Sequence, residues 1–314
     1  MTTTHSKLTA LLSLCFSAML SCSDAGQPRT HQSQDIGHEL GTARIVEPAT
    51  GLPRVVLVCL HGIQSNRDWW VPLGEELASR GIAVWAFNRP GSGNPPPPGP
   101  AKVTSNDLHE WAGHMNIVNV AVRQKYGDVP VFATGVSWGA SPALLASRGE
   151  GDRKKAAWAG AILLNPAFKT TRDSAFLLNV VCHFLPWNWF RPIHIPLRTS
   201  DYTTQDATKG HYLQDAQLKK TATFGFLKKT GQVKKDAVKR LKEPGPRVLI
   251  LLGDADPLVT PYLFYKATGL REQETEFLTV KHVPNATHAA IVEPEKRVIA
   301  EEIAHWITKH SKRR

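Results

Sequence analysis

Cysteine is scarce in this sequence, which has four cysteines among 314 residues. Their spacing matches no common metal-binding pattern. Cys15 and Cys22 lie in an N-terminal segment that we expect to be processed, which leaves Cys59 and Cys182. Cys59 stands inside the apolar run VVLVCL, which predicts a buried, unreactive thiol. We therefore expect the fold to be held by its hydrophobic core and not by disulfide bonds.

Internal repeats are not visible, and nothing in the composition suggests a disordered or fibrous chain. Hydrophobic residues make up 42% of the sequence and aromatic residues 8%, as in ordinary globular proteins with a core. Acidic residues are outnumbered, so that the formal net charge is +11. A chain of this length is compatible with one domain if the fold is of the α/β class.

The N-terminal residues 1–21 are typical of an export signal. A short polar start with Lys7 precedes an apolar stretch, residues 8–20, that is too short to span a bilayer comfortably. The stretch ends at Ser21-Cys22, which is similar to bacterial lipoprotein signals, in which the cysteine becomes the acylated first residue. The alternative is an ordinary cleaved signal with Cys22 incidental or removed. We expect export in either case, and with acylation a lipid anchor in a membrane of the bacterial cell envelope.

The rest of the chain predicts a mostly parallel sheet with helices on both faces, because buried apolar strands alternate with amphipathic helices. Residues 22–37 are polar and predict a linker. We expect a hairpin over residues 43–62 and further strands within residues 82–91, 129–135, 158–168, 246–256 and 276–288. We expect helices within residues 74–81 and 105–127, after Ser137, and from about Pro294 to the C-terminus.

One serine stands in a special position. The segment FATGVSWGAS, residues 132–141, places Ser137 between Gly135 and Gly139, after an apolar strand and before a helix. This Gly-x-Ser-x-Gly pattern is typical of a nucleophile elbow, a turn so tight that only glycine fits beside the serine. Such a turn raises the hydroxyl off the sheet and directs the helix N-terminus at it. The alternative is an ordinary serine in a tight turn.

Other motifs occur in a consistent order with this one. They are LHG at 60–62, NRPGSG at 88–93, LLNPA at 163–167, GDADPLV at 253–259 and NATH at 285–288. Together with the serine motif they resemble the α/β-hydrolase family, and more closely its monoacylglycerol lipase and lysophospholipase branch. The resemblance covers most of residues 40–308. One departure is Asn88, where the family usually has aspartate in a structural position, so we expect little effect on the chemistry.

The resemblance implies a core formed by residues 38–168 and 246–314, interrupted by a largely helical cap, residues 169–245. It also implies the order serine, acid, histidine for a catalytic triad. His288 follows the last predicted strand in the loop NATHAA and is the expected base. Asp256 is the favoured acid, and Asp254 could instead brace the same turn. The backbone amides of Ile63 and Trp138 are the expected oxyanion hole.

The expected reaction is hydrolysis of a carboxylic ester through an acyl-enzyme at Ser137, with no metal or organic cofactor. The expected substrate is a lipid-like ester, with a monoglyceride or lysophospholipid as the leading candidate. Small esters, thioesters or peptides are alternatives, as is acyl transfer to an acceptor other than water. A module of the same fold that only binds a ligand is a further alternative, which the intact set of serine, aspartate and histidine disfavours.

The predicted cap has two unusual stretches. The first is rich in apolar and aromatic residues, such as FLPWNWF at 184–190, which indicates an acyl tunnel or a lid that touches a membrane, unless these residues only pack on the sheet edge. The second, residues 219–242, has nine lysines or arginines and one acid, Asp236. This run is either a solvated face or a surface for anionic headgroups. Nucleic-acid binding is disfavoured because an exported protein would rarely meet it.

Overall fold

The structure is a computed structural model that describes residues 29–93, 107–151, 157–173, 192–270 and 275–311. The predicted signal, the acylated Cys22, the aromatic stretch at 184–190 and Cys182 lie outside these residues. Nothing in the structure therefore tests them. No helix of the described ranges is both long and apolar enough to cross a bilayer.

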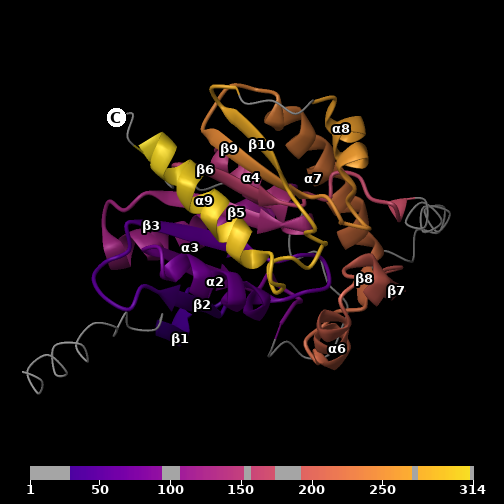
Figure 1. Ribbon diagram of the computed structural model, residues 1–314, viewed down its shortest axis with the longest axis horizontal. Coiled ribbons are helices and arrows are strands. Elements are labelled where there is room, and N and C mark those ends of the chain that lie inside the picture. Colours follow the sequence, from indigo (N-terminus) through magenta and orange to yellow (C-terminus); the bar gives the residue numbers. More distant parts are fainter. Residues whose placement is uncertain (1–28, 94–106, 152–156, 174–191, 271–274, 312–314) are drawn as a thin grey trace, which may run out of the picture.

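The centre of the molecule is an eight-stranded sheet in the order β1-β2-β4-β3-β5-β6-β9-β10 (Figure 1). Its strands are β1 (Arg29–Asp35), β2 (Thr42–Glu47), β3 (Val55–Leu60), β4 (Ile82–Phe87), β5 (Val131–Val136), β6 (Gly160–Leu164), β9 (Arg247–Gly253) and β10 (Leu278–Val283). Neighbouring strands from β4 to β10 run parallel, whereas β1 and β2 are antiparallel additions at one edge. The predicted mostly parallel sheet is confirmed.

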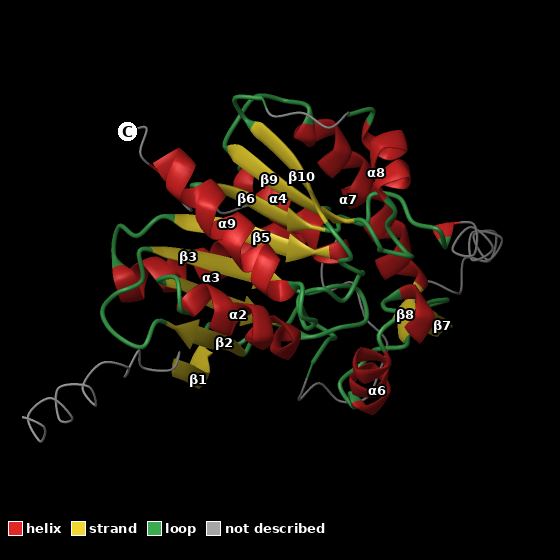
Figure 2. Cartoon of the chain, in the orientation of Figure 1, coloured by secondary structure: helices red, strands yellow, loops and turns green. Residues whose placement is uncertain are grey.

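Helices cover both faces of the sheet, which explains why its central strands are apolar throughout (Figure 2). In β3, Val56, Val58 and Leu60 face the side of α3 (Glu110–Tyr126) and α4 (Ala140–Ser147). The alternate residues, with Cys59 among them, face α2 (Val71–Ala78) and α9 (Lys296–Ser311). Burial raises the pKa of the Cys59 thiol well above its ordinary value, as expected for an unreactive cysteine.

The antiparallel edge of the sheet differs from the sequence-based prediction in two ways. β2 does not form a hairpin with β3, because both sides of β3 are occupied by β4 and β5, and β2 pairs with β1 and β4 instead. Residues 29–35 belong to β1 and not to a linker, so the linker prediction for residues 22–37 is wrong there. A polar sequence can form this strand because β1 is outermost in the sheet and needs no second neighbour.

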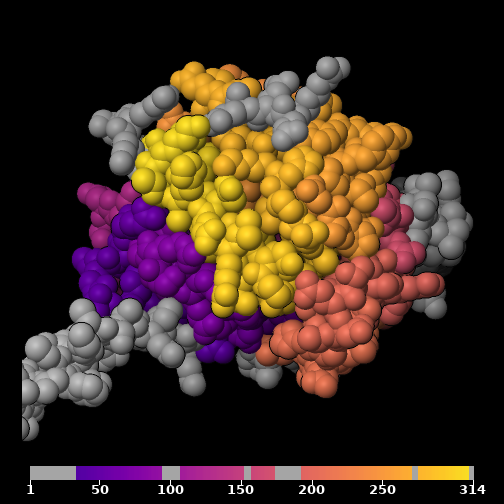
Figure 3. All heavy atoms as spheres, in the orientation of Figure 1, coloured from indigo at the N-terminus to yellow at the C-terminus, as the bar shows by residue number. Residues whose placement is uncertain are grey.

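Residues 192–223 form a lobe at one end of the molecule, around α6 (Asp206–Gln214), which is visible at the lower right of Figure 3. It also contains the short helix η5 (Thr199–Asp201) and a separate two-stranded sheet, β7 (Pro192–His194) with β8 (Thr221–Thr223). Helix α7 (Phe224–Leu241) falls within the predicted cap. It nevertheless joins the helix layer, because its buried apolar residues pack in the same core cluster as α3 and α4.

A buried ion pair joins α7 to α3. The ammonium group of Lys229 lies 3.2 Å from the carboxylate of Glu110, and the two side chains are only 8% and 5% exposed. The same ammonium lies 4.9 Å from the ring centre of Trp111. Removing one member of such a pair leaves the other charge buried without its partner, which is costly. Lys229 therefore belongs to the packing of the helix layer and not to a solvated face.

We expect Lys229→Met to lower the free energy of unfolding by about 3 kcal/mol, because Glu110 then loses its buried counter-charge. The double variant Lys229→Met/Glu110→Gln should recover part of this loss. Lys239, which is exposed on the same helix, provides the matched control Lys239→Met. Urea denaturation followed by circular dichroism measures the free energy of unfolding of the native protein and the three variants. Equal stability of Lys229→Met and Lys239→Met would contradict the assignment.

Candidate active site

Ser137 occupies a strained turn between β5 and α4. Its backbone φ of 56° is in the left-handed region, which residues other than glycine rarely adopt. A short 3₁₀ turn, η2 (Ser137–Gly139), leads directly into α4. A Cβ atom on Gly135 would lie 2.2 Å from the carbonyl oxygen of Gly139, and one on Gly139 would lie 2.4 Å from that of Leu60. Both glycines are therefore required by close backbone contacts, as the elbow motif predicts.

His288 and Asp256 form a buried pair at the carboxyl edge of the sheet. The Nδ1 atom of His288 lies 2.6 Å from Oδ2 of Asp256, and the two side chains are 2% and 0% exposed. The backbone N–H groups of Leu258 and Val259 donate to the other oxygen of Asp256, at 2.8 and 2.7 Å. Three hydrogen bonds thus hold the carboxylate, two from backbone N–H groups of its own loop and one from the Nδ1 proton of His288.

The second nitrogen of His288, Nε2, is buried and has no hydrogen bond with any described residue. Because Asp256 keeps the proton on Nδ1, Nε2 carries the lone pair and is available as a proton acceptor. Asp254, the alternative acid, lies elsewhere. It pairs with Nδ1 of His282 at 2.5 Å, and both of these side chains are partly exposed. The structure therefore brings Asp256, and not Asp254, to His288.

Asn165, which the sequence did not single out, links the loops that carry Asp256 and His288. It follows β6 with a φ of 43°, and its side-chain nitrogen Nδ2 donates to the carbonyl of Thr287 at 3.0 Å. Its side-chain oxygen accepts the N–H of Gly253 at 2.7 Å. In the same loop, the N–H of Ala167 donates to the carbonyl of Ser137 at 3.1 Å. One short loop thus contacts the serine turn, the loop before Asp256 and the residue before His288. The motif LLNPA was the available signal.

The turn after β3 lies against Ser137. A Cβ atom on Gly62 would be 3.4 Å from Cβ of Ser137, and Ile63 follows immediately. His61 fixes this turn, because its Nδ1 atom donates to the carbonyl of Gly62 at 2.7 Å and its Nε2 atom accepts from Ser92 at 3.0 Å and from the N–H of Arg89 at 3.4 Å. Burial and the charge of Arg89 lower the pKa of His61 to about 3.

Arg89 is a second residue whose contribution was not foreseen. It is 1% exposed, and its Nη2 atom donates to the carbonyl of Ile63 at 2.7 Å. Its guanidinium lies 5.0 Å from the ring centre of Trp138 and 4.7 Å from that of Phe226. Burial lowers its pKa to about 9. Arg89 therefore contacts both residues whose amides were predicted to form the oxyanion hole.

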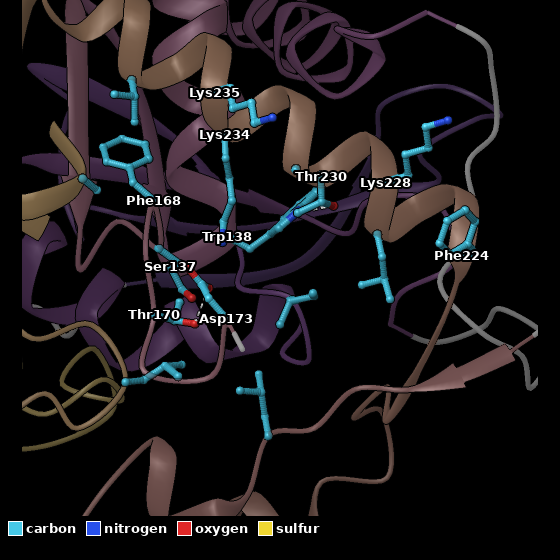
Figure 4. A pocket seen from close by; sticks show the side chains of 18 residues that line it. Ser137, Trp138, Phe168, Thr170, Asp173, Phe224, Lys228, Thr230, Lys234 and Lys235 are labelled. Carbon is cyan, nitrogen blue, oxygen red and sulfur yellow. Dashed lines mark hydrogen bonds between the residues drawn. The ribbon is translucent and has the colours of Figure 1, made fainter. Parts of the chain in front are cut away.

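A cavity of about 720 Å³ opens beside these groups (Figure 4). Ser137, Trp138 and Ile63 line it together, so the two predicted oxyanion residues lie on the same cavity as the serine. Most of the remaining lining is apolar and consists of Ala167, Phe168, Leu197, Phe224, Leu227, Val238, Leu258 and Ala267. Among the described residues, no group of three or more histidine, cysteine, aspartate or glutamate side chains is arranged to hold a metal ion.

Most of the chain matches the model of a known protein family. The family described as serine aminopeptidase, S33, matches residues 51–295, which is most of the chain. Among curated proteins, no sequence matches significantly.

Solved structures extend the likeness to the whole fold. Monoacylglycerol lipase from Paleococcus ferrophilus has a TM-score of 0.66 and 19% identity, over 85% of this chain and 99% of the lipase. A soluble variant of monoglyceride lipase from Saccharomyces cerevisiae, bound to a substrate analog, has a TM-score of 0.68 and 17% identity. The match covers 91% of this chain and 97% of that lipase. A carboxyl esterase from Bacillus coagulans, bound to glycerol, has a TM-score of 0.65 and 17% identity. The match covers 90% of this chain and 98% of the esterase. At these identities the likeness establishes the fold.

We expect His61 to make the protein sensitive to acid. Its pKa in the folded state, about 3, lies below the ordinary value near 6.5, so the unfolded chain takes up this proton first as the pH falls. Stability should therefore be lost between these two values, by at most about 1.4 kcal/mol per pH unit. In His61→Gln this loss should be smaller, while in His305→Gln, an exposed control, it should be unchanged. Urea denaturation at pH 7, 5.5 and 4 measures it. Parallel pH curves for all three proteins would contradict the expectation.

Proposed function

The chain belongs to the serine aminopeptidase S33 family of α/β-hydrolases, and on that basis we propose that it hydrolyses carboxylic esters through an acyl-enzyme on Ser137. The observation that carries the proposal is the buried pair of His288 and Asp256, whose free Nε2 atom lies at the same sheet edge as the serine turn. The loop around Asn165, which contacts both turns, supports their proximity.

The proposed mechanism assigns each group one task. Asp256 holds the Nδ1 proton of His288, so Nε2 accepts the proton of Ser137 as its oxygen attacks the ester carbonyl. The amides of Ile63 and Trp138 stabilise the oxyanion, and the alcohol leaves with the proton from Nε2. Water then attacks the acyl-enzyme with His288 as base, which releases the acid and restores Ser137.

The acyl group of the substrate is proposed to be apolar. The cavity beside Ser137 is lined mainly by aliphatic and aromatic side chains, and apolar surface of this kind is buried favourably against an acyl chain. Two of the structurally similar proteins are lipases of monoacylglycerols or monoglycerides, which supports a lipid-like ester.

The family description suggests aminopeptidase activity as the second candidate. An aminopeptidase has to bind the ammonium group of a free N-terminus, which requires negative charge near the nucleophile. The described lining of the cavity carries one carboxylate, Asp173, and three lysines. This balance disfavours a cationic substrate and favours the ester.

We also propose, from the N-terminal sequence alone, that the protein is exported and anchored in the bacterial cell envelope through an acylated Cys22. Its membrane contact would then begin at that residue, with residues 23–28 leading to β1.

We expect Ser137→Ala and His288→Ala to lower kcat by about 10³-fold or more, because each removes a group that the acylation step requires. Asp256→Asn should lower kcat by about 10³-fold, since an amide does not hold His288 in the same tautomer. Hydrolysis of p-nitrophenyl esters from acetate to laurate measures these effects, and kcat/KM should rise with chain length. Asp254→Asn is the matched control and should stay within about twofold of the native protein.

The opposite pattern would overturn the assignment. If Asp254→Asn were the damaging change, the acid would be misassigned. If leucine p-nitroanilide were cleaved faster than every ester, the aminopeptidase candidate would replace the esterase.

We expect the purified native protein to begin at Cys22 and to carry lipid on that residue. Intact mass spectrometry of protein from a membrane fraction measures this, with Cys22→Ser as the comparison. An N-terminus upstream of Cys22, or an unmodified Met1, would contradict both export processing and anchoring.

A further inference from the structure

Helix α7 presents a cationic face to the cavity that contains Ser137. The residues of α7 that line the cavity recur at helical spacing and therefore share one side of the helix. They are Leu227, Lys228, Gly231, Lys234, Lys235 and Val238, next to Phe224 and Thr230. Buried residues such as Val233 and Ala237 lie on the opposite side and pack in the core. The cavity thus meets lysines at three positions in an otherwise apolar face.

Lys234 is the lysine best placed to act inside the cavity. In Figure 4 its side chain extends from α7 toward Trp138, which follows the proposed nucleophile. Burial lowers the pKa of its ammonium group, and the charge of Asp173 acts in the opposite direction without cancelling that effect. A cation in such apolar surroundings is stabilised by a further anion nearby.

The only carboxylate in the described lining is Asp173, which follows β6. Its Oδ1 atom already accepts a hydrogen bond from the hydroxyl of Thr170 at 2.7 Å. The charged groups that face the cavity are therefore Asp173 on one side and Lys228, Lys234 and Lys235 on the other. Lys228 and Lys235 are exposed, so the partly buried Lys234 is the cation that extends into the cavity.

The positions of these lysines also show how the lysine- and arginine-rich residues 219–242 are used. Lys229 is buried in an ion pair with Glu110, and Arg240 pairs with Glu150 and Glu243. Of the three lysines of α7 that line the cavity, Lys234 extends toward Trp138, whereas Lys228 and Lys235 are exposed. The run as a whole is therefore neither a uniform solvated face nor a uniform surface for a membrane.

We propose that the preferred substrate is an anionic amphiphile, an ester with an apolar acyl chain and a phosphate-like anionic headgroup, and that Lys234 is the residue that selects it. The inference rests on the proposed ester hydrolysis at Ser137 and names its substrate class. The ester carbonyl binds at Ser137, the acyl chain lies along the apolar lining, and the anionic group pairs with the ammonium of Lys234.

The test compares 1-lauroylglycerol with 1-lauroylglycerol 3-phosphate, both below the concentrations at which they form micelles. The native protein should show a kcat/KM about tenfold higher for the phosphate ester, since one ion pair in apolar surroundings typically contributes a factor of this order. In Lys234→Met the ratio should fall to about one, and in Lys234→Arg much of it should return. Lys239→Met, an exposed change on the same helix outside the cavity, should keep the native ratio.

A variant with the opposite effect separates selection from simple damage. Asp173→Asn removes the carboxylate that competes with the substrate anion, so the ratio should rise above the native value. A native ratio near one would overturn the proposal, as would a ratio that is unchanged in Lys234→Met. Inhibition by inorganic phosphate at the same concentration as the substrate would also overturn it, because the site would then bind the free anion and not a headgroup.

Binding separates this inference from the proposed hydrolysis. Dodecyl phosphate should bind Ser137→Ala more tightly than uncharged dodecanol does in titration calorimetry, and the added Lys234→Met change should remove the difference. If no ester is hydrolysed but this difference is observed, the anion site stands and the proposed reaction fails. If lauroylglycerol is hydrolysed by the native protein but the two ligands bind alike, the reaction stands and the anion site fails.

Discussion

The close approach of the turn at Ser137 to the end of β3 is the constraint on which the site depends. Gly139 lies so near the carbonyls of Leu60 and His61 that no side chain fits between them. This contact keeps the serine in its left-handed conformation and places the turn of Gly62 and Ile63 beside it. Strain of about 1–3 kcal/mol at such a residue persists only because the surrounding structure enforces it.

Two buried groups with lowered pKa values, His61 and Arg89, then stiffen the neighbouring turn. His61 stays neutral because burial and the charge of Arg89 lower its pKa, and Arg89 brings a positive charge under Ile63 and Trp138. No carboxylate is paired with Arg89 among the described residues, and its Nε and Nη1 atoms have no hydrogen bonds there. The proposed oxyanion would therefore form next to a cation that is held by aromatic rings and one carbonyl.

The sequence predicted the parallel part of the sheet well, because strands such as β3 and β5 are buried on both sides and read as unbroken apolar runs. It failed at β1, where an outer strand needs no apolar pattern. The closing helix was also predicted, and α9 buries apolar residues such as Ile299 and Ile303 against the sheet. Asp256 could be favoured from its motif, but Arg89, Asn165 and Lys234 could not be identified, because their contacts come from distant parts of the chain.

Helix α7 has two faces, one packed in the core and one lining the cavity, and Thr230 belongs to both. Substitutions at Lys228, Lys234 or Val238 can therefore alter what the cavity accepts, while Phe226 and Leu241 keep the helix in place. A protein built in this way can diverge in specificity through a few changes without first acquiring extra stability. The helix is thus the natural place for evolution, or an engineer, to adapt the fold to a new ligand.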